Sequence, residues 1–242
     1  MFENIYLDTE TTGLDGSAEI IQIGIVADDG RVLFDSLVQC QGDIPEQASA
    51  VHGITKDDLL NAPTWPQIHE TVCKLLLSAE KLKIYNASFD LRMLRQTAAR
   101  YDLQLPDLQG FCVMKAYGNL FFDGDWIKLT EACHYEKIDI STLPAHNAVG
   151  DCQMTRLLDC QIMKEEQRRR IRLERREALK AKKMKLVPPN ADDFPYFGQC
   201  YRPDGFKTMS QLNKRDLATF EFAGTCCNTF GDRGFLFKPK GD

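Results

Sequence analysis

The sequence lacks the features that mark membrane, secreted and zinc-stabilised proteins. No apolar stretch approaches the ~18 residues that span a bilayer, so we expect no membrane segment. The first residues, Met1 to Asn4, carry neither the basic region nor the apolar run of a secretory signal. The nine cysteines are odd in number and form no Cys-x-x-Cys pair, which argues against a disulfide framework and a zinc site. We therefore expect reduced thiols in a cytoplasmic protein.

The composition is that of a globular protein whose charge is unevenly distributed. Hydrophobic residues make up 43% and charged residues 27% of the 242 residues, which is too apolar for a disordered chain. The formal net charge is −5, but residues 164–185 contain eleven Lys or Arg and four Glu, a local charge of +7. The rest of the chain therefore carries −12, which suggests clustered carboxylates and a metal site. The basic segment suggests contact with a polyanion or, alternatively, a solvated helix with many ion pairs.

The order of predicted elements indicates an α/β fold over residues 1–163. Strands are expected at residues 4–8, 19–27, 31–38 and 82–85, and Asp28-Asp29-Gly30 predicts a hairpin between the second and third. Helical spacing of apolar residues predicts helices at residues 66–77, 88–101, 129–134 and 148–163. Three strands followed by strand–helix units suggest a mixed sheet flanked by helices.

The C-terminal third has a different character. We expect the last helix to continue to about Lys185 within a basic helix and linker segment, residues 164–189, where Pro188-Pro189 stops it. Residues 190–242 form a small module of unknown fold. From Leu186 onward the chain has ten Phe or Tyr, with a helix expected at residues 210–220 and a strand at residues 234–238.

The first pair of candidate metal ligands lies in the segment DTETTGL, residues 8–14, at the end of the first predicted strand. Residues i and i+2 of a strand point to the same face, so Asp8 and Glu10 direct two carboxylates to one point. Two like charges held together are costly unless a cation lies between them. Taken alone, the pair also fits a solvated surface strand.

Two further carboxylates lie where predicted helices begin. Asp90, in YNASFD (residues 85–90), falls in the first helical turn with Ser88 as the expected N-cap, where it could also simply favour the helix dipole. Asp151, in HNAVGD (residues 146–151), opens an amphipathic helix, and His146 lies in the loop before it. A separation of five residues lets a loop histidine and a first-turn carboxylate converge on one site.

Together, the four carboxylates and the histidine predict a metal-dependent site for phosphoryl transfer. All lie at strand–helix junctions, where α/β folds place their sites. Four acids can hold two divalent ions roughly 3.5–4 Å apart, which suits in-line displacement at phosphorus. One ion would lower the pKa of a bound water whose proton His146 could accept, and the other would stabilise the leaving 3′-oxygen.

DTETTGL, NASFD and HNAVGD resemble, in order and spacing, the three motifs of the DEDDh 3′→5′ exonucleases. This group includes the proofreading epsilon subunit of bacterial replicase, exodeoxyribonuclease X, RNase T and oligoribonuclease. The resemblance covers about residues 1–163 and implies an RNase H-like fold, with a mixed five-stranded sheet flanked by helices. It also implies that Asp8, Glu10, Asp90 and Asp151 are metal ligands and that His146 is the general base.

The same resemblance implies a substrate pocket. Thr11 and Leu14 correspond to positions that contact the 3′-terminal nucleotide. His52, in AVHGIT (residues 50–55), lies in a segment that approaches the terminal nucleotides in the proofreading and exodeoxyribonuclease X-like members. Asn86 is a further candidate contact. Phe89 is expected either in the pocket wall or as a packed core aromatic.

These features favour an exonuclease that uses two Mg²⁺ or Mn²⁺ ions on single-stranded DNA or frayed 3′ ends and releases nucleoside 5′-monophosphates. The alternative within the class is an exoribonuclease that trims RNA 3′ ends, because the motifs do not settle the sugar. The alternative outside the class is a proofreading or assembly subunit associated with a DNA polymerase.

The basic segment has two interpretations. Arg168, Arg169, Arg170 and Arg172 are candidate phosphate contacts, which would make affinity fall steeply with salt. Alternatively, the C-terminal region mediates a homodimer or binds a polymerase partner, with its aromatic side chains as anchors.

Overall fold

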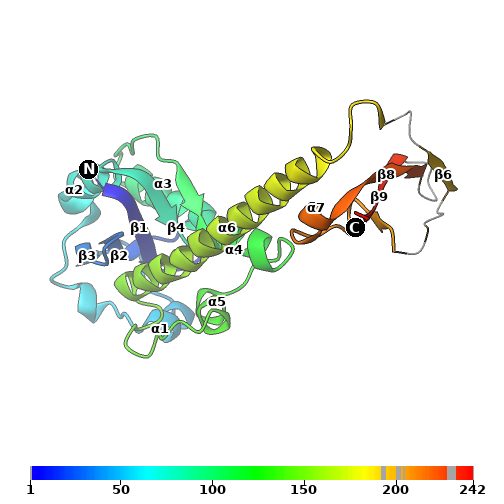
Figure 1. The fold of residues 1–242 in the computed structure, drawn as a ribbon. Helices are drawn as coiled ribbons and strands as arrows, with labels where there is room; N and C mark the ends of the chain where they lie inside the picture. The colour runs from blue at the N-terminus through cyan, green and yellow to red at the C-terminus, as the bar shows by residue number, and fades with distance from the viewer. Residues whose placement is uncertain (1, 192–194, 200–202, 204, 228–232, 242) are drawn as a thin grey trace. The chain divides into compact units, whose positions relative to one another are not determined.

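The protein, described from a computed structural model, divides into two compact units, Met1–Glu165 and Glu166–Asp242 (Figure 1). The structure describes all residues except 1, 192–194, 200–202, 204, 228–232 and 242. The sequence predicts three segments instead, residues 1–163, 164–189 and 190–242. One helix, α6 (Ala148–Met184), runs from the first unit into the second. The basic segment is therefore the second half of the helix that begins within HNAVGD.

A mixed five-stranded sheet forms the centre of the first unit, as predicted. Its strand order is β3-β2-β1-β4-β5, with β1 antiparallel to β2 and parallel to β4. β2 and β3 pair antiparallel through the predicted hairpin, where Gly30 adopts a φ of 88°, and β4 and β5 pair parallel. The strands are β1 (Phe2–Thr11), β2 (Ile20–Ala27), β3 (Val32–Leu37), β4 (Ala79–Ile84) and β5 (Gly110–Cys112).

The predicted helices of the first unit are present, and two further α-helices accompany them. The unit contains α1 (Glu46–His52), a 3₁₀ turn (Asp57–Leu59), α2 (Trp65–Leu76), α3 (Ala87–Arg100), α4 (Val113–Phe121), α5 (Leu129–Tyr135) and the first part of α6. The sequence pattern does not predict α1 or α4. α1 has seven residues and buries none of them, so it lacks the periodic apolar face on which such a prediction depends.

Helices cover both faces of the sheet (Figure 1). On one face, α2 and α3 contribute Trp65, Val72, Met93 and Leu94 to the largest apolar cluster, which also contains Ile5 and Leu7 of β1. On the other face, α6 packs Cys152 against Tyr6 and Val26. Since side chains alternate along β1, the even-numbered residues Tyr6, Asp8 and Glu10 face α6. The fold thereby places both carboxylates of the first motif towards the helix that carries the last.

A buried ion pair joins α6 to the sheet. Lys83 of β4 donates a hydrogen bond to Asp159 of α6 at 2.5 Å, and their side chains are 8% and 1% exposed. The Tyr6 hydroxyl donates to the same carboxylate oxygen at 2.8 Å. Burial, reinforced by the negative charge of Asp159, raises the pKa of Tyr6, so this hydroxyl keeps its proton. The three side chains fix the position of α6 two turns beyond Asp151.

The second unit contains a four-stranded sheet, order β6-β8-β9-β7, in addition to its part of α6. Its elements are β6 (Tyr196–Gln199), β7 (Lys207–Thr208), α7 (Asp216–Thr219), β8 (Phe220–Cys227) and β9 (Arg233–Pro239). Phe220, Phe222 and Phe237 form its buried core together with Leu212 and Ala191. The predicted strand at residues 234–238 is confirmed as the main part of β9.

The predicted helix at residues 210–220 is wrong. Only Asp216–Thr219 is helical, and Phe220 already begins β8. The Gln211 side chain accepts the backbone N–H of Thr208, and the Asn213 side chain accepts those of Arg215 and Asp216. Such local side-chain bonds satisfy the backbone in turns and compete with helix formation.

Two findings concern the described residues of both units. Among the described residues, no helix combines the length and the apolar character that crossing a bilayer requires. The eight cysteines in the described part of the chain form no disulfide.

Replacing Asp159 by Leu should lower the free energy of unfolding by about 3–5 kcal/mol, because Lys83 then becomes a buried, unpaired charge. The double variant Lys83→Met/Asp159→Leu should recover most of that loss, since no charge is left without its partner. Urea unfolding measures both effects. A single variant as stable as the parent protein would show that the ion pair does not fasten α6.

Candidate active site

The first motif lies inside β1, which is longer than the sequence predicts. β1 continues to Thr11, so Asp8 and Glu10 are both strand residues. Asp8 is paired with Gly24 of β2, and the pairing shifts by one residue between Glu10 and Thr11. A bulge of this kind bends a strand and changes the direction of the side chains that follow it. The bulge therefore lies between the two carboxylates and the segment that begins at Thr11.

The N-terminus of α6 packs directly against β2. A Cβ atom at Gly24 would lie 2.7 Å from the carbonyl carbon of Ala148, so only glycine permits this approach. Gln22 of β2 accepts the backbone N–H of Ala148 at 3.2 Å. The Asn147 side chain accepts the N–H of Gly150 at 3.1 Å and thus caps the helix. These contacts place Asp151, in the first turn, opposite β1.

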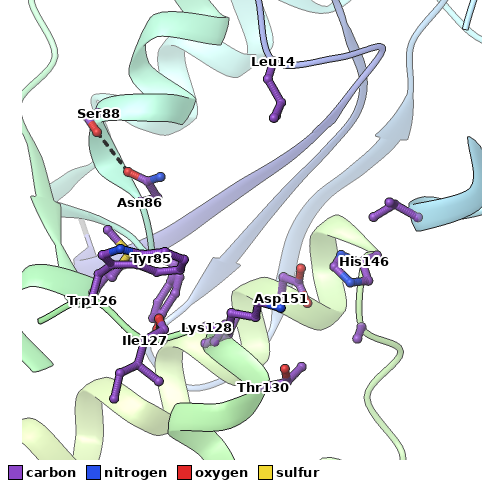
Figure 2. Close-up of a pocket in the computed structure, with 14 residues that line it drawn as sticks. Leu14, Tyr85, Asn86, Ser88, Trp126, Ile127, Lys128, Thr130, His146 and Asp151 are labelled. Atoms are coloured by element: carbon purple, nitrogen blue, oxygen red, sulfur yellow. Dashed lines mark hydrogen bonds between the residues drawn. The ribbon is translucent and has the colours of Figure 1, made fainter. Parts of the chain in front are cut away.

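The second motif contributes Asp90 from the first turn of α3. The Thr9 hydroxyl donates to the Asp90 carboxylate at 2.8 Å, which ties the helix to β1. The expected N-cap role of Ser88 is wrong, because α3 begins at Ala87 and Asn86 occupies the cap position. The Ser88 hydroxyl instead donates to the Asn86 side chain at 2.9 Å, as Figure 2 shows.

The structure brings the carboxylates of the three motifs together. Ligand oxygens of Asp8, Glu10 and Asp151 all lie within 4.8 Å of one another. Asp90 is outside this group of three but close enough for its charge to raise the pKa values of Asp8 and Glu10. Residues separated by more than 140 positions in the chain thus form one acidic cluster.

The cluster is strained electrostatically. Burial, followed by the charges of Asp90, Asp151 and Glu10, raises the pKa of Asp8 well above its usual range. Burial and the neighbouring aspartates raise the pKa of Glu10 to about 8. Burial raises the pKa values of Asp90 and Asp151 to about 7, although hydrogen bonds from Thr9 and from the backbone of His146 oppose the respective shifts.

This donor set fits divalent cations. In the described part of the chain, no Lys or Arg forms an ion pair with any of the four carboxylates. Carboxylate oxygens are the ligands that hard cations such as Mg²⁺ prefer, and a bound cation would remove the repulsion that raises the pKa values. The cluster can therefore hold metal through Asp8, Glu10 and Asp151, with Asp90 beside them.

His146 lies two residues before α6, on the exposed rim of the cluster. Its φ of 56° lies in the left-handed region, which non-glycine residues seldom adopt. Both His146 and Asp151 line the same cavity (Figure 2). The imidazole is therefore solvent-accessible and close to the acidic cluster, as a proton acceptor for bound water has to be.

Two cavities meet at the acidic cluster. The smaller, about 350 Å³, is lined by Glu10 and by the segment that follows it, together with α1 and Phe89. The larger, about 910 Å³, is lined by Asp151 and His146 together with residues of the α4–α5 loop. Leu14 and Val51 line both cavities. The cluster therefore lies where the two cavities adjoin.

The predicted substrate contacts are divided between these cavities. Thr11, His52 and Phe89 line the smaller one, whereas Asn86 lines the larger. The His52 Nδ1 atom accepts the N–H of Ile54 at 3.0 Å, so the neutral ring carries its proton on the buried Nε2 atom. Burial lowers the pKa of His52, a hydrogen bond with the backbone of Thr11 opposes this shift, and the nearby His146 adds to it.

The four candidate phosphate contacts of the basic segment line neither cavity. Arg168, Arg169, Arg170 and Arg172 belong to the second unit and are exposed on α6. Arg170 also pairs with Glu174 at 3.8 Å, one helical turn away. Their role in phosphate binding therefore stays a prediction.

Several residues that shape the site are not predicted from the sequence. Gln22, Gly24 and Thr9 act through contacts that depend on strand register. Cys152, next to Asp151, donates to the backbone carbonyls of Tyr6 and Gly24 at 3.4 and 3.3 Å, and so holds α6 to two strands. The only sequence signal for it is its position directly after the last aspartate.

Comparison with known proteins gives consistent matches to this region. The RNase T family model, described as an exonuclease, matches residues 5–158. The protein named Uncharacterized exonuclease CP81, from Escherichia phage 186, is 36% identical over 165 residues, which cover 63% of this chain and 84% of that protein. The DNA polymerase III epsilon subunit of Escherichia coli (strain K12) is 30% identical over 163 residues, covering 62% of this chain and 67% of its own.

Solved structures share the fold. Exonuclease X in complex with 5′-overhanging duplex DNA aligns with a TM-score of 0.53 and 27% identity, over 67% of this chain and 92% of that chain. The nuclease domain of 3′hExo, described as a DEDDh family member bound to rAMP, aligns with a TM-score of 0.56 and 18% identity, over 67% and 92% of the two chains. The family match includes all four carboxylates and His146.

The metal-free protein should lose stability as pH rises from about 4 to about 8. Acids with raised pKa values hold protons in the folded state that the unfolded chain releases near pH 4, so the free energy of unfolding falls as pH passes through the folded pKa values. Saturating Mg²⁺ should therefore raise the melting temperature more at pH 8.5 than at pH 5.5. The Asp8→Asn variant should show a smaller increment, and an equal Mg²⁺ increment at both pH values would contradict the shifts.

Proposed function

Because the chain belongs to the RNase T/DnaQ-like family of DEDDh exonucleases, we propose that it removes nucleotides from the 3′ end of single-stranded DNA and releases nucleoside 5′-monophosphates. The observation that carries the proposal is the acidic cluster at the junction of two cavities. A strand whose scissile phosphate lies at the cluster has one cavity for the nucleotide to be released and another for the rest of the strand.

The proposed mechanism assigns a role to each residue of the motifs. Asp8, Glu10, Asp90 and Asp151 would hold two Mg²⁺ or Mn²⁺ ions. When bound, the ions supply Lewis-acid activation of water and stabilise charge on the phosphate and the leaving 3′-oxygen. His146 accepts the proton of the attacking water, which its exposed position at the rim permits. Thr9 holds the Asp90 carboxylate in place through its hydrogen bond.

The smaller cavity would receive the 3′-terminal nucleotide. Leu14 and Phe89 offer apolar surface to its base and sugar, and Thr11 contributes backbone contacts. His52 lines this cavity and carries its proton on Nε2, beside the backbone of Thr11, where an oxygen of the substrate would accept it.

The choice of DNA over RNA is supported by one comparison. Exonuclease X, at 27% identity, is in complex with DNA, whereas the nuclease domain bound to rAMP is 18% identical. The epsilon subunit is by name part of a polymerase, but the family match ends at residue 158, before the second unit begins. The family match therefore covers the nuclease unit and leaves the second unit unmatched.

Incubation with 5′-labelled single-stranded DNA and Mg²⁺ should give stepwise shortening, and chelation or Asp8→Asn should abolish it. His146→Gln should lower kcat about 10²–10⁴-fold, the contribution of a general base, while keeping the thermal stabilisation by Mg²⁺. Asp28→Asn, in the exposed β2–β3 turn, is the matched control and should be fully active. Faster shortening of RNA than of DNA would overturn the choice of substrate.

We further propose that the cationic surface of α6 binds substrate phosphates. Replacing Arg168, Arg169, Arg170 and Arg172 by Gln should weaken binding of single-stranded DNA and reduce the slope of log K against log salt by about 0.7 per lost contact. The control neutralises four exposed residues of the first unit that line neither cavity, Arg31, Lys74, Lys81 and Lys137. Equal slopes in both variants would reject a specific role for the helix.

A further inference from the structure

The two tryptophans of the chain have opposite environments. Trp65 is completely buried in the main apolar cluster, whereas Trp126 is 67% exposed. Trp126 lies in the α4–α5 loop and lines the larger cavity together with Asp151 and His146 (Figure 2). A large aromatic side chain left exposed beside an acidic cluster loses the free energy of burial unless a ligand covers it.

The loop that carries Trp126 is well anchored. The Tyr85 hydroxyl donates to the backbone carbonyl of Ile127, and Ile127 itself packs against the cluster formed by α4, α5 and α6. The backbone N–H groups of Gly124 and Asp125 donate to Gly118 and Phe122 at the end of α4. The backbone on both sides of Trp126 is thus held in place, so little backbone entropy is left to lose on binding.

The walls near Trp126 combine apolar and cationic groups. Tyr85, Met114 and Leu129 line the same cavity, and Lys128 follows two residues after Trp126. A ligand that matches these walls has a flat apolar part and a negative charge, which describes a nucleotide unit of a single strand. Stacking of bases on aromatic side chains tolerates any sequence, because every base has a π face.

We propose that Trp126 stacks on the base of the nucleotide immediately 5′ of the scissile phosphate. The inference rests on the proposed function, in which that phosphate lies at the acidic cluster. Glu10 lines the smaller cavity and Asp151 the larger, and their oxygens lie within 4.8 Å of each other. A phosphate at the cluster therefore has one neighbouring nucleotide in each cavity, and the cavity with the greater volume takes the continuing strand.

The test compares two oligonucleotides, one with thymine and one with an abasic residue at the penultimate position. For the first cleavage step, Trp126→Ala should lower kcat/KM about tenfold on the thymine substrate, which corresponds to ~1.4 kcal/mol and lies in the range of base–aromatic stacking. The variant and the parent protein should cleave the abasic substrate at similar rates, because the base that would stack on Trp126 is gone. Trp126→Phe should retain most of the activity on thymine.

The control is Tyr135→Ala, an exposed aromatic residue of α5 that lines neither cavity, and it should cleave both substrates as the parent protein does. A parent protein that shortens neither oligonucleotide contradicts the proposed function. A parent protein that shortens both, with Trp126→Ala losing the same factor on each, contradicts the stacking inference alone.

Fluorescence provides a readout that needs no turnover. With Trp65 buried, single-stranded DNA added to the chelated protein should quench the emission of the exposed Trp126, and the quenching should disappear in Trp126→Phe. Anisotropy of labelled DNA measures binding independently. If the DNA binds and the emission of Trp126 does not change, the inference is overturned.

Discussion

Mutual repulsion among four carboxylates is the constraint on which the architecture of the first unit depends. Asp8, Glu10, Asp90 and Asp151 occupy one largely buried region; burial raises the pKa of each, and the charges of neighbouring carboxylates add to the shifts of Asp8, Glu10 and Asp90. Separated elements hold them there: a central strand, the first turn of α3 and the first turn of α6. Without strong packing, these elements would move apart until water solvated every charge.

The packing that resists this repulsion is concentrated along α6. At its start, the helix approaches β2 so closely that Gly24 has no room for a side chain, and Gln22 accepts the backbone N–H of Ala148. One residue beyond Asp151, the Cys152 thiol bonds to the carbonyls of two strands. Further along, the buried pair of Lys83 and Asp159 fixes the helix again. Cation binding would then add to the stability of the fold, because it offsets the repulsion among the carboxylates.

The sequence predicts the carboxylates of this site better than it predicts the residues that hold them in position. Strand alternation places Asp8 and Glu10 on one face, and helix starts place Asp90 and Asp151, because these relations are local. The contacts of Gly24, Gln22 and Thr9 depend on register between distant segments, which no local pattern encodes. Residues 210–220 show the same limit, since side-chain bonds of Gln211 and Asn213 favour turns over the helix that composition suggests. Trp126 belongs to no sequence motif, and only the structure of the α4–α5 loop shows that its side chain is exposed.

In the proposed mechanism, the different volumes of the two cavities explain why cleavage takes place at the end of a strand. A cluster of carboxylates alone would activate water against any phosphodiester that reached it, within a strand or at its end. Here the cluster adjoins about 350 Å³ on one side and about 910 Å³ on the other, with Leu14 and Val51 common to both. In the proposed mechanism the smaller space selects a terminal nucleotide, and the larger space, with its fixed aromatic wall, retains the strand. Specificity for strand ends then follows from the shape of the two cavities, while hydrolysis depends on the carboxylates that lie between them.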